Sequence, residues 1–307
     1  MAALNPPGSL PTEAEVILRL LISAKGRRLP RERVDRLVTP PSLSPTSAEG
    51  SAAAESETMV VCRSTGLVRR DGDDLVLGDA LASHLSKEPD RLRLRTAIRK
   101  TFFMTVSPED ARSSNEGAGD LARAAAWFLM QDTWAPRQGW DGPQGWEDLQ
   151  QKQLIKEHQT LVNATRWGAM DRWLPYLGLA VHDLRDSSGR SSGQVLVPDP
   201  TSAVRDELQA ILPNVGTQRS LKAVLAELAA ACPVLDGGIY HSVVRDRIAP
   251  GTVPSIAGVF SPGLSHALRR LDDAKDFELL DRGDAEKVLL STLEEPIPFS
   301  HIVRLKA

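Results

Sequence analysis

The chain has 307 residues, of which 41% are hydrophobic and 25% charged, and its formal net charge at pH 7 is −3. These values are ordinary for a soluble protein of two or three domains. No apolar run reaches the ~18 residues that a membrane-spanning helix needs, and the first residues lack the pattern of a signal peptide. Cys62 and Cys232 lie far apart among apolar residues, which predicts buried free thiols in a reducing, cytoplasmic compartment.

Residues 1–90 are predicted to form a winged helix-turn-helix domain. Three segments with helical spacing of apolar residues precede Gly66. The stretch GLVRRDGDDLVLGDAL, residues 66–81, then has an Asp71-Gly72 turn signal between two short strands, which predicts a β-hairpin that closes the domain. Within this domain, TPPSLSPTSAEGSAAA, residues 39–54, is rich in proline and serine and predicts a disordered insertion.

Residues 91–198 are predicted to form an all-helical middle domain with one aromatic core. All six tryptophans of the chain fall in this region, which suggests that they pack together. Because residues 105–200 are net acidic, with 9 Lys or Arg against 13 Asp or Glu, a base-stacking platform is disfavoured. Residues 186–193 have the composition of a flexible loop. The tryptophans are Trp127, Trp134, Trp140, Trp146, Trp167 and Trp173.

Residues 199–307 repeat the winged-helix order, with an enlarged wing. Helical patterns are followed by two apolar stretches, 277–282 and 299–305, that read as paired strands, and a short helix is expected between them. The predicted fold class is therefore mainly α with small β wings, in which two winged helix-turn-helix domains flank a Trp-rich helical domain.

The helix that starts at Ser261-Pro262 is the best candidate for contact with DNA. Its leucines recur at helical spacing and predict an inward face, which leaves polar and basic side chains outward. Arginine can donate two parallel hydrogen bonds to guanine, while serine and histidine can contact phosphates. The equivalent N-terminal helix has Glu55 and Glu57 against Arg63, which argues against base readout there. The outward residues are Ser265, His266, Arg269 and Arg270.

Two further basic stretches are weaker candidates. Arg69 and Arg70 precede the hairpin turn, although three aspartates surround it. The segment RLRLRTAIRKTFFM, residues 91–104, alternates basic and apolar residues without an acid, which fits either a solvated helix face or a phosphate-contacting one. Its basic residues are Arg91, Arg93, Arg95, Arg99 and Lys100.

No pattern of residues indicates a catalytic site, a metal site or a cofactor. The six histidines show no metal-binding spacing, and no phosphate-binding loop or nucleophile elbow is present. The turn Asp236-Gly237-Gly238 is a weak candidate for binding an anion, since its amides open a helix; the alternative is that Asp236 caps that helix. The sequence therefore leans against an enzyme.

Four segments carry a resemblance to a known family. They are RWLPYLGLA (172–180), VLVPDPTSAVRDEL (195–208), PVLDGGIY (233–240) and SPGLSHALRRL (261–271). They resemble DpdG-like proteins, which are encoded in bacterial gene clusters that insert 7-deazaguanine bases into DNA and restrict unmodified DNA. The resemblance implies an accessory protein of an anti-phage defence system, and it supplies no functional residues.

The favoured function is a non-catalytic adaptor that holds other subunits of the defence complex, with double-stranded DNA as a further partner. The first alternative is a winged-helix transcription regulator, although no dimerisation element is visible. The second is a divergent metal-dependent nuclease subunit that uses carboxylates such as Asp199 or Asp236. The sequence does not define the oligomeric state.

Overall fold

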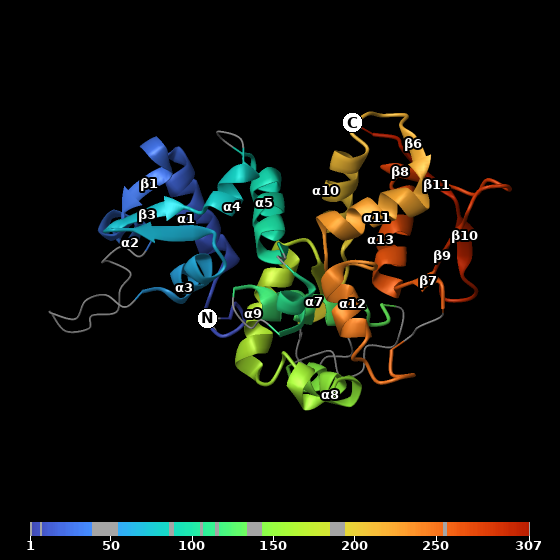
Figure 1. Ribbon diagram of the computed structural model, residues 1–307, viewed down its shortest axis with the longest axis horizontal. Coiled ribbons are helices and arrows are strands. Elements are labelled where there is room, and N and C mark those ends of the chain that lie inside the picture. The colour runs from blue at the N-terminus through green and yellow to red at the C-terminus, as the bar shows by residue number, and fades with distance from the viewer. Residues whose placement is uncertain are drawn as a thin grey trace.

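The computed structural model describes residues 2–6, 8–38, 55–85, 89–104, 107–113, 117–133, 143–184, 194–253 and 257–306. Within these ranges the protein is mainly α-helical with small β-sheets, as the sequence predicted, although it has four sheets of two or three strands instead of two wings alone. The N-terminal elements lie on one side of the molecule, the C-terminal elements on the other, and the central helices between them (Figure 1). The predicted disordered insertion 39–54 and the loop 186–193 lie outside the described residues.

The N-terminal elements contain the three expected helices and the expected hairpin. Gly66 ends the third helix with a φ of 76°, and the turn at Gly72 has a φ of 61°, so both positions favour glycine. A short strand that the sequence analysis missed joins the hairpin and makes a three-stranded sheet of order β1-β3-β2. In chain order the elements are α1 (Pro11–Ser23), β1 (Arg28–Pro30), α2 (Arg31–Val38), α3 (Glu57–Ser64), β2 (Val68–Asp71) and β3 (Asp74–Leu77).

The hairpin closes this end of the molecule, as predicted. Val68, Leu75 and Leu77 are buried, whereas the residues around the turn are exposed. Strand β3 lies in the middle of the sheet and pairs with β1 on one side and β2 on the other. The apolar side chains of the hairpin therefore belong to the core, and its charged tip faces solvent.

The central helices surround α7 (Gly119–Leu129), every residue of which is buried. Four of the six tryptophans are described, and all four are buried. Trp146 stacks on Trp167 at 5.5 Å between ring centroids and meets Trp127 edge-on at 5.7 Å. Trp134 and Trp140 lie outside the described residues. The other central helices are α4 (Asp79–Ser83), α5 (Arg91–Phe103), α6 (Pro108–Ser113), α8 (Pro143–Gln153) and α9 (Ala164–Tyr176).

The middle region is not all-helical. After Gly178, which has a φ of 78°, the chain forms an antiparallel pair of strands, β4 (Ala180–Leu184) and β5 (Gln194–Pro198). Val195, Leu196 and Val197 are buried in succession, so the segment lacks the alternation that marks a half-buried strand. Because this apolar run is continuous, the sequence could not distinguish the β4–β5 pair from a helix.

The C-terminal elements form a sheet that matches the N-terminal one in strand order. Its order is β6-β11-β8, so the last strand in the chain again lies in the middle. The predicted pairing of 277–282 with 299–305 is confirmed, with His301 opposite Leu280. The elements are α10 (Thr201–Ile211), β6 (Gln218–Ser220), α11 (Leu221–Ala231), α12 (Ile239–Arg245), α13 (Pro262–Asp273), β8 (Phe277–Leu280) and β11 (His301–Arg304).

The prediction of a short helix between β8 and β11 is wrong. The chain there forms β9 (Val288–Leu290) and β10 (Ile297–Phe299), which make a separate sheet with β7 (Val259–Phe260). Val288 and Leu290 are buried while Leu289 is half-buried, which is the alternation of a strand. Pro296 and Pro298 also disfavour a helix.

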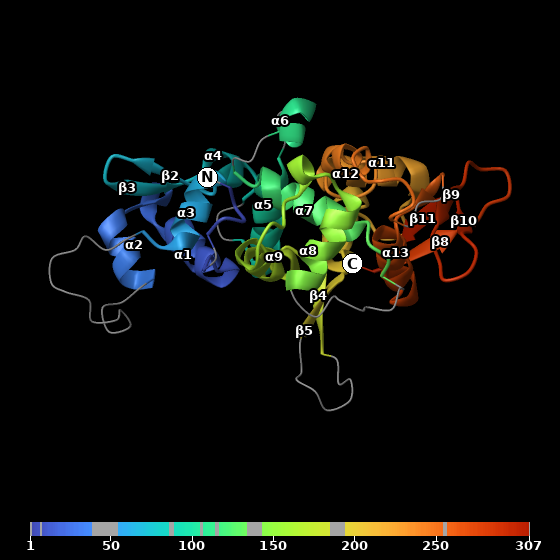
Figure 2. The same ribbon diagram turned by 90° about the horizontal axis from the view of Figure 1, so that it is seen from below.

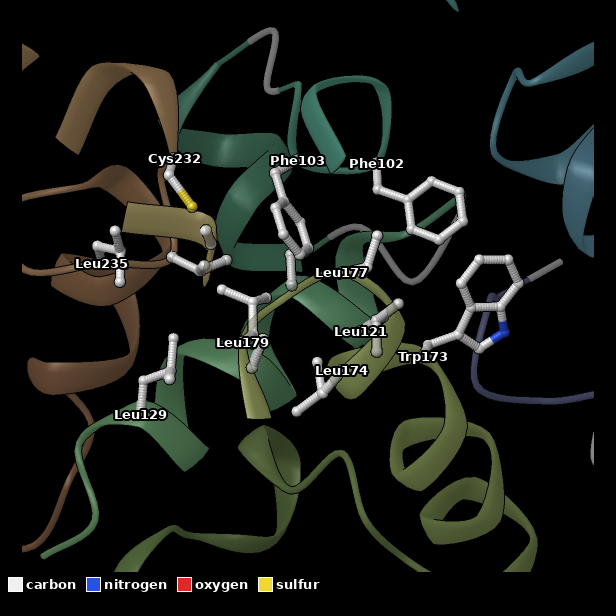
Figure 3. Packing of buried hydrophobic residues seen from close by; sticks show 14 of the residues in the cluster. Phe102, Phe103, Leu121, Leu129, Trp173, Leu174, Leu177, Leu179, Cys232 and Leu235 are labelled. Carbon is white, nitrogen blue, oxygen red and sulfur yellow. The ribbon is translucent and has the colours of Figure 1, made fainter. Parts of the chain in front are cut away.

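The core is shared along the whole chain. Buried apolar side chains form one continuous cluster from Ala3 to Ile302. In Figure 3, Leu121 of α7 and Leu174 of α9 lie side by side, and Phe102 of α5 and Leu235, which precedes α12, lie on opposite sides of the same cluster. The N-terminal residues are tied to this core by Asp120, whose carboxylate accepts hydrogen bonds from the amides of Ala3 and Leu4.

Both cysteines are buried and free, as predicted. Burial raises the pKa of the Cys232 thiol to about 12, and it also raises the pKa of Cys62. Both thiols are therefore protonated and unreactive at neutral pH.

Candidate nucleic-acid and protein interfaces

Helix α13 does not present all four of the predicted DNA-binding side chains to solvent. Ser265 is 0% exposed: its hydroxyl donates to the Phe260 carbonyl at 3.3 Å and accepts from the Ser291 amide at 2.9 Å. The prediction that Ser265 faces outward is therefore wrong. The apolar stripe alone could not show this, because the sheet strand β7 and the segment after β9 cover this side of the helix.

The other polar residues of α13 are partly engaged within the protein. Arg270 forms an ion pair with Asp199, which is buried and also accepts from the Thr201 amide at 3.0 Å. His266 is half-buried, and burial lowers its pKa. Arg269 is half-buried and forms no ion pair in the part of the chain that the structure describes. The outer side of α13 thus offers Arg269 as its unneutralised arginine.

The turn at Asp236 is organised by its neighbours rather than by an anion. Both carboxylate oxygens of Asp236 are used by Ser261, from its amide at 2.7 Å and its hydroxyl at 2.6 Å. Asp236 therefore supports the start of α13 and does not cap α12, whose N-cap is Gly238. A Cβ at Gly238 would lie 2.3 Å from the Pro233 carbonyl oxygen, so the close approach of the backbone requires glycine.

Two cavities flank this turn and share Asp236, Gly237 and Phe260 as lining residues. The first, of about 780 Å³, lies between the end of α5 and α11, and its wall includes Phe103 and Met104. The second, of about 750 Å³, contains His241, which is 6% exposed and whose Nδ1 has no hydrogen-bond partner. Burial lowers the pKa of His241, so the ring is neutral at pH 7.

Each arginine near the hairpin lies within 4 Å of a carboxylate. Arg69 lies 3.7 Å from Asp79 and Arg70 lies 3.9 Å from Asp73. The remaining pairs of this surface join Arg28 to Asp71 at 3.2 Å and to Asp74 at 2.9 Å, and Arg63 of α3 to Glu55 at 2.7 Å.

The basic face predicted on α5 is also neutralised. Arg99 is 0% exposed and forms an ion pair with Glu207 at 2.8 Å. The prediction that Arg99 contacts DNA is therefore wrong. The sequence could not show this, because the acids that face α5 lie more than 100 residues away on α10. The other pairs are Arg91–Glu15 at 3.3 Å, Arg93–Asp90 at 3.7 Å, Arg95–Asp206 at 2.8 Å and Lys100–Glu207 at 3.1 Å.

A different group of basic side chains, which the sequence analysis did not single out, comes together at the ends of several helices. Arg112 of α6 and Arg247, which follows α12, are 135 residues apart, yet Arg247 Nη1 donates to the Arg112 carbonyl at 3.1 Å. Arg123 of α7 donates to the neighbouring Ala111 carbonyl at 3.3 Å. No local sequence motif predicts this group, because the packing of α12 on α6 and α7 brings its members together.

The described residues contain no helix that is both long and apolar enough to cross a membrane. Over the same residues, no group of three or more His, Cys, Asp or Glu side chains could hold a metal ion.

The profile of one protein family, described as DpdG-like, matches residues 1–285. The chain belongs to the DpdG-like family. This match confirms the resemblance seen in the sequence. The family is consistent with a protein encoded in a 7-deazaguanine DNA modification cluster. No curated protein and no solved structure matches the chain.

The segments that carried the DpdG-like resemblance are structural in the folded protein. The first two cover the end of α9, the first residue of β4, most of β5 and most of α10. The third contains the Asp236 turn and the fourth is α13, and Asp236 joins them through Ser261. The DpdG-like pattern thus reports the packing of the C-terminal half.

Proposed function

We propose that this DpdG-like protein is a non-catalytic adaptor of a 7-deazaguanine DNA modification and restriction system, and that it holds partner subunits at DNA. Membership of the DpdG-like family supports the assignment of the protein to this modification and restriction system. The element order supports two winged-helix units, because each unit has helices, a short first strand and a sheet whose last strand lies in the middle. We expect these units at residues 1–90 and 199–307, with the region 91–198, which is mainly helical and contains the β4–β5 pair, between them.

The observation that carries the proposal is the neutralised hairpin of the N-terminal unit. In a DNA-binding winged helix the third helix and the wing contact DNA, and binding gains from counterions that basic residues release from phosphates. Here Arg63, Arg69 and Arg70 each have a carboxylate within 4 Å. Those carboxylates would approach the phosphates together with the arginines, which removes the electrostatic gain. A surface of paired, exposed charges suits a protein partner with complementary charges better.

The same contacts argue against the nuclease alternative. Asp199 is engaged by Arg270 and Thr201, and Asp236 by Ser261, so neither carboxylate is arranged with a second acid around a metal position. Asp199 is buried and Asp236 half-buried, and these partners satisfy their carboxylate oxygens.

The test is co-expression of the tagged protein with the other proteins encoded in the same modification cluster, followed by affinity purification and size-exclusion chromatography. We expect a stable complex with at least one of them. The purified protein alone should leave plasmid DNA intact with Mg²⁺ or Mn²⁺. Cleavage that is lost in Asp199→Asn or Asp236→Asn, or no complex with any protein of the cluster, would overturn the proposal.

A further inference from the structure

Four arginines from separate parts of the chain come together at one surface, three of them exposed or half-buried and the fourth, Arg123, buried. The surface is held together by backbone contacts: the Ala249 amide donates to the Gln153 carbonyl at 2.8 Å, and Leu154 pairs with Ile248. These contacts bring the end of α8 and the following turn, Lys156–His158, beside the end of α12. The arginine cluster consists of Arg112, Arg123, Arg166 and Arg247, with His158 at its edge.

The cluster differs from the other basic surfaces in what its side chains bond. Arg247 and Arg166 each donate to a neutral backbone carbonyl, respectively of Arg112 at 3.1 Å and of Thr160 at 3.1 Å, while Arg123 donates to the Ala111 carbonyl at 3.3 Å and has further interactions. Within the described parts of the chain, Arg112, Arg166 and Arg247 form no salt bridge with a carboxylate. On the hairpin and on α5, by contrast, every candidate arginine has such a partner.

The positive charges of the cluster act on one another. Burial, and then the charge of Arg112, lowers the pKa of Arg247. Burial also lowers the pKa of Arg123, and Arg247 and Arg166 add to the effect against the opposing charge of Asp120. The pKa of His158 is lowered by burial and then by Arg247. Like charges gathered in this way cost free energy, which a bound anion would offset.

Several acids lie near these arginines: Glu109 is one turn before Arg112 on α6, and Asp110 accepts from the Ser107 hydroxyl at 2.7 Å. Asp120 is buried, and its oxygens accept from the amides of Ala3, Leu4 and Leu121. Asp246 lies 3.9 Å from Arg245, and its charge partly opposes the fall in the pKa of Arg247; Glu157 is exposed.

One structural role is evident, since Arg123 and Arg247 hold the last carbonyls of α6, where cations are favourable. That role needs one N–H group from each arginine and does not involve the exposed side chain of Arg112. Arginine presents five N–H donors in a planar fork that fits two oxygens of a phosphate. Arg112 is exposed and Arg166 and Arg247 are half-buried, so the cluster has donors left for an external anion.

We infer that the arginine cluster binds the phosphodiester backbone of DNA, which gives the adaptor its contact with DNA away from both winged-helix hairpins. This inference rests on the proposed function, in which the protein works at DNA. Because phosphates carry no base sequence, the contact is independent of sequence and strongly dependent on salt.

The test is binding of a fluorescent random-sequence duplex, measured by anisotropy between about 50 and 200 mM salt. The variant Arg112→Glu/Arg247→Glu is compared with Arg69→Glu/Arg70→Glu, which changes the net charge by the same amount on the hairpin. We expect the cluster variant to lose at least about tenfold in affinity and about 2 units of the salt slope, and the hairpin variant to lose less than about threefold.

A single variant, Arg112→Glu, guards against unfolding because that side chain makes none of the bonds that hold α6. It should lower the affinity in the same direction, and Arg247→Lys, which keeps the charge, should retain most of it. Equal losses in the cluster and hairpin variants, or no salt-dependent duplex binding by the wild type, would overturn the inference. Binding of a free nucleoside triphosphate without duplex binding would also overturn it. Complex formation with the other proteins encoded in the modification gene cluster tests the proposed function separately, because it does not depend on whether the arginine cluster binds DNA.

Discussion

Arg99 and Glu207, which are 108 residues apart in the chain, meet inside the protein. Arg99 Nη2 donates to Glu207 Oε1 at 2.8 Å, and neither side chain is more than 1% exposed. Arg99 also donates to the Leu177 carbonyl at 3.0 Å and lies 3.2 Å from Asp206. This network fixes α5 against α10. It thereby fixes the central helices, which lie between the N-terminal and the C-terminal elements (Figure 2), against the C-terminal elements.

Removing the arginine from this network should be costly. In Arg99→Met, the buried carboxylate of Glu207 keeps Lys100 at 3.1 Å but loses its buried partner. We expect the free energy of unfolding to fall by about 3 kcal/mol, the lower end for a broken buried pair. Urea denaturation measures it. The double variant Arg99→Met/Glu207→Gln should lose less than the sum of the two single changes. A loss below about 1 kcal/mol in Arg99→Met would show that the network does not hold the helices together.

Gly238 should tolerate no side chain. In Gly238→Ala the new Cβ would meet the Pro233 carbonyl oxygen at 2.3 Å, so the backbone must shift. We expect a destabilisation of about 1–3 kcal/mol, together with weaker protection of the α12 amides in hydrogen exchange. Gly283→Ala is the control, because nothing lies within 4 Å of its Cβ position, and it should change stability by less than about 0.5 kcal/mol. Equal effects in the two variants would contradict the packing described at Asp236.

His241 should make the protein less stable in mild acid. Burial lowers its pKa in the folded state, so as the pH falls below about 6.5 the unfolded chain takes up a proton that the folded protein does not. Stability is therefore lost from that point down to the folded pKa, by at most about 1.4 kcal/mol per pH unit. Between pH 7.5 and 5.5, the unfolding free energy of His241→Gln should change less than that of the wild type. Parallel curves for the two proteins would show that His241 is not the titrating group.

Arg269 and Arg270 should differ although they are neighbours on α13. Arg270 is paired with the buried Asp199, so Arg270→Gln should cost about 1–2 kcal/mol, which allows for the half-exposed position of Arg270. Arg269 has no such partner within the described residues, so Arg269→Gln should leave stability within about 0.5 kcal/mol of the wild type. Thermal unfolding of both variants decides between them, and the reverse order would contradict the assigned pairing.

The sequence predicted those parts of the structure that depend on local signals. The N-terminal helices, the Asp71-Gly72 hairpin and the buried cysteines follow from spacing, turn residues and apolar neighbours. Strand β1 was missed because three residues give no periodic signal, and the β4–β5 pair because Val195, Leu196 and Val197 form an unbroken apolar run.

The candidate site was harder to predict because charge partners are set by tertiary contacts. Arg95 and Arg99 read as a solvated or DNA-facing surface until α10 brings Asp206 and Glu207 against them. The arginine cluster, in turn, has no pattern in the chain, since Arg112 and Arg247 meet only in the folded protein. The arginines of α5, which composition suggested as a DNA-facing surface, are paired with acids, and the candidate DNA contact is instead the arginine cluster.

The most direct test of the account is the charge reversal Arg69→Glu/Arg70→Glu, scored for complex formation with the other proteins of the modification cluster and for duplex DNA binding. Since the hairpin is assigned to a protein partner, we predict that the variant folds, that its DNA affinity stays within about threefold of the wild type, and that capture of the partner falls at least about tenfold. A folded variant that keeps its partner but no longer binds DNA would contradict the account and would make the hairpin a DNA-binding wing.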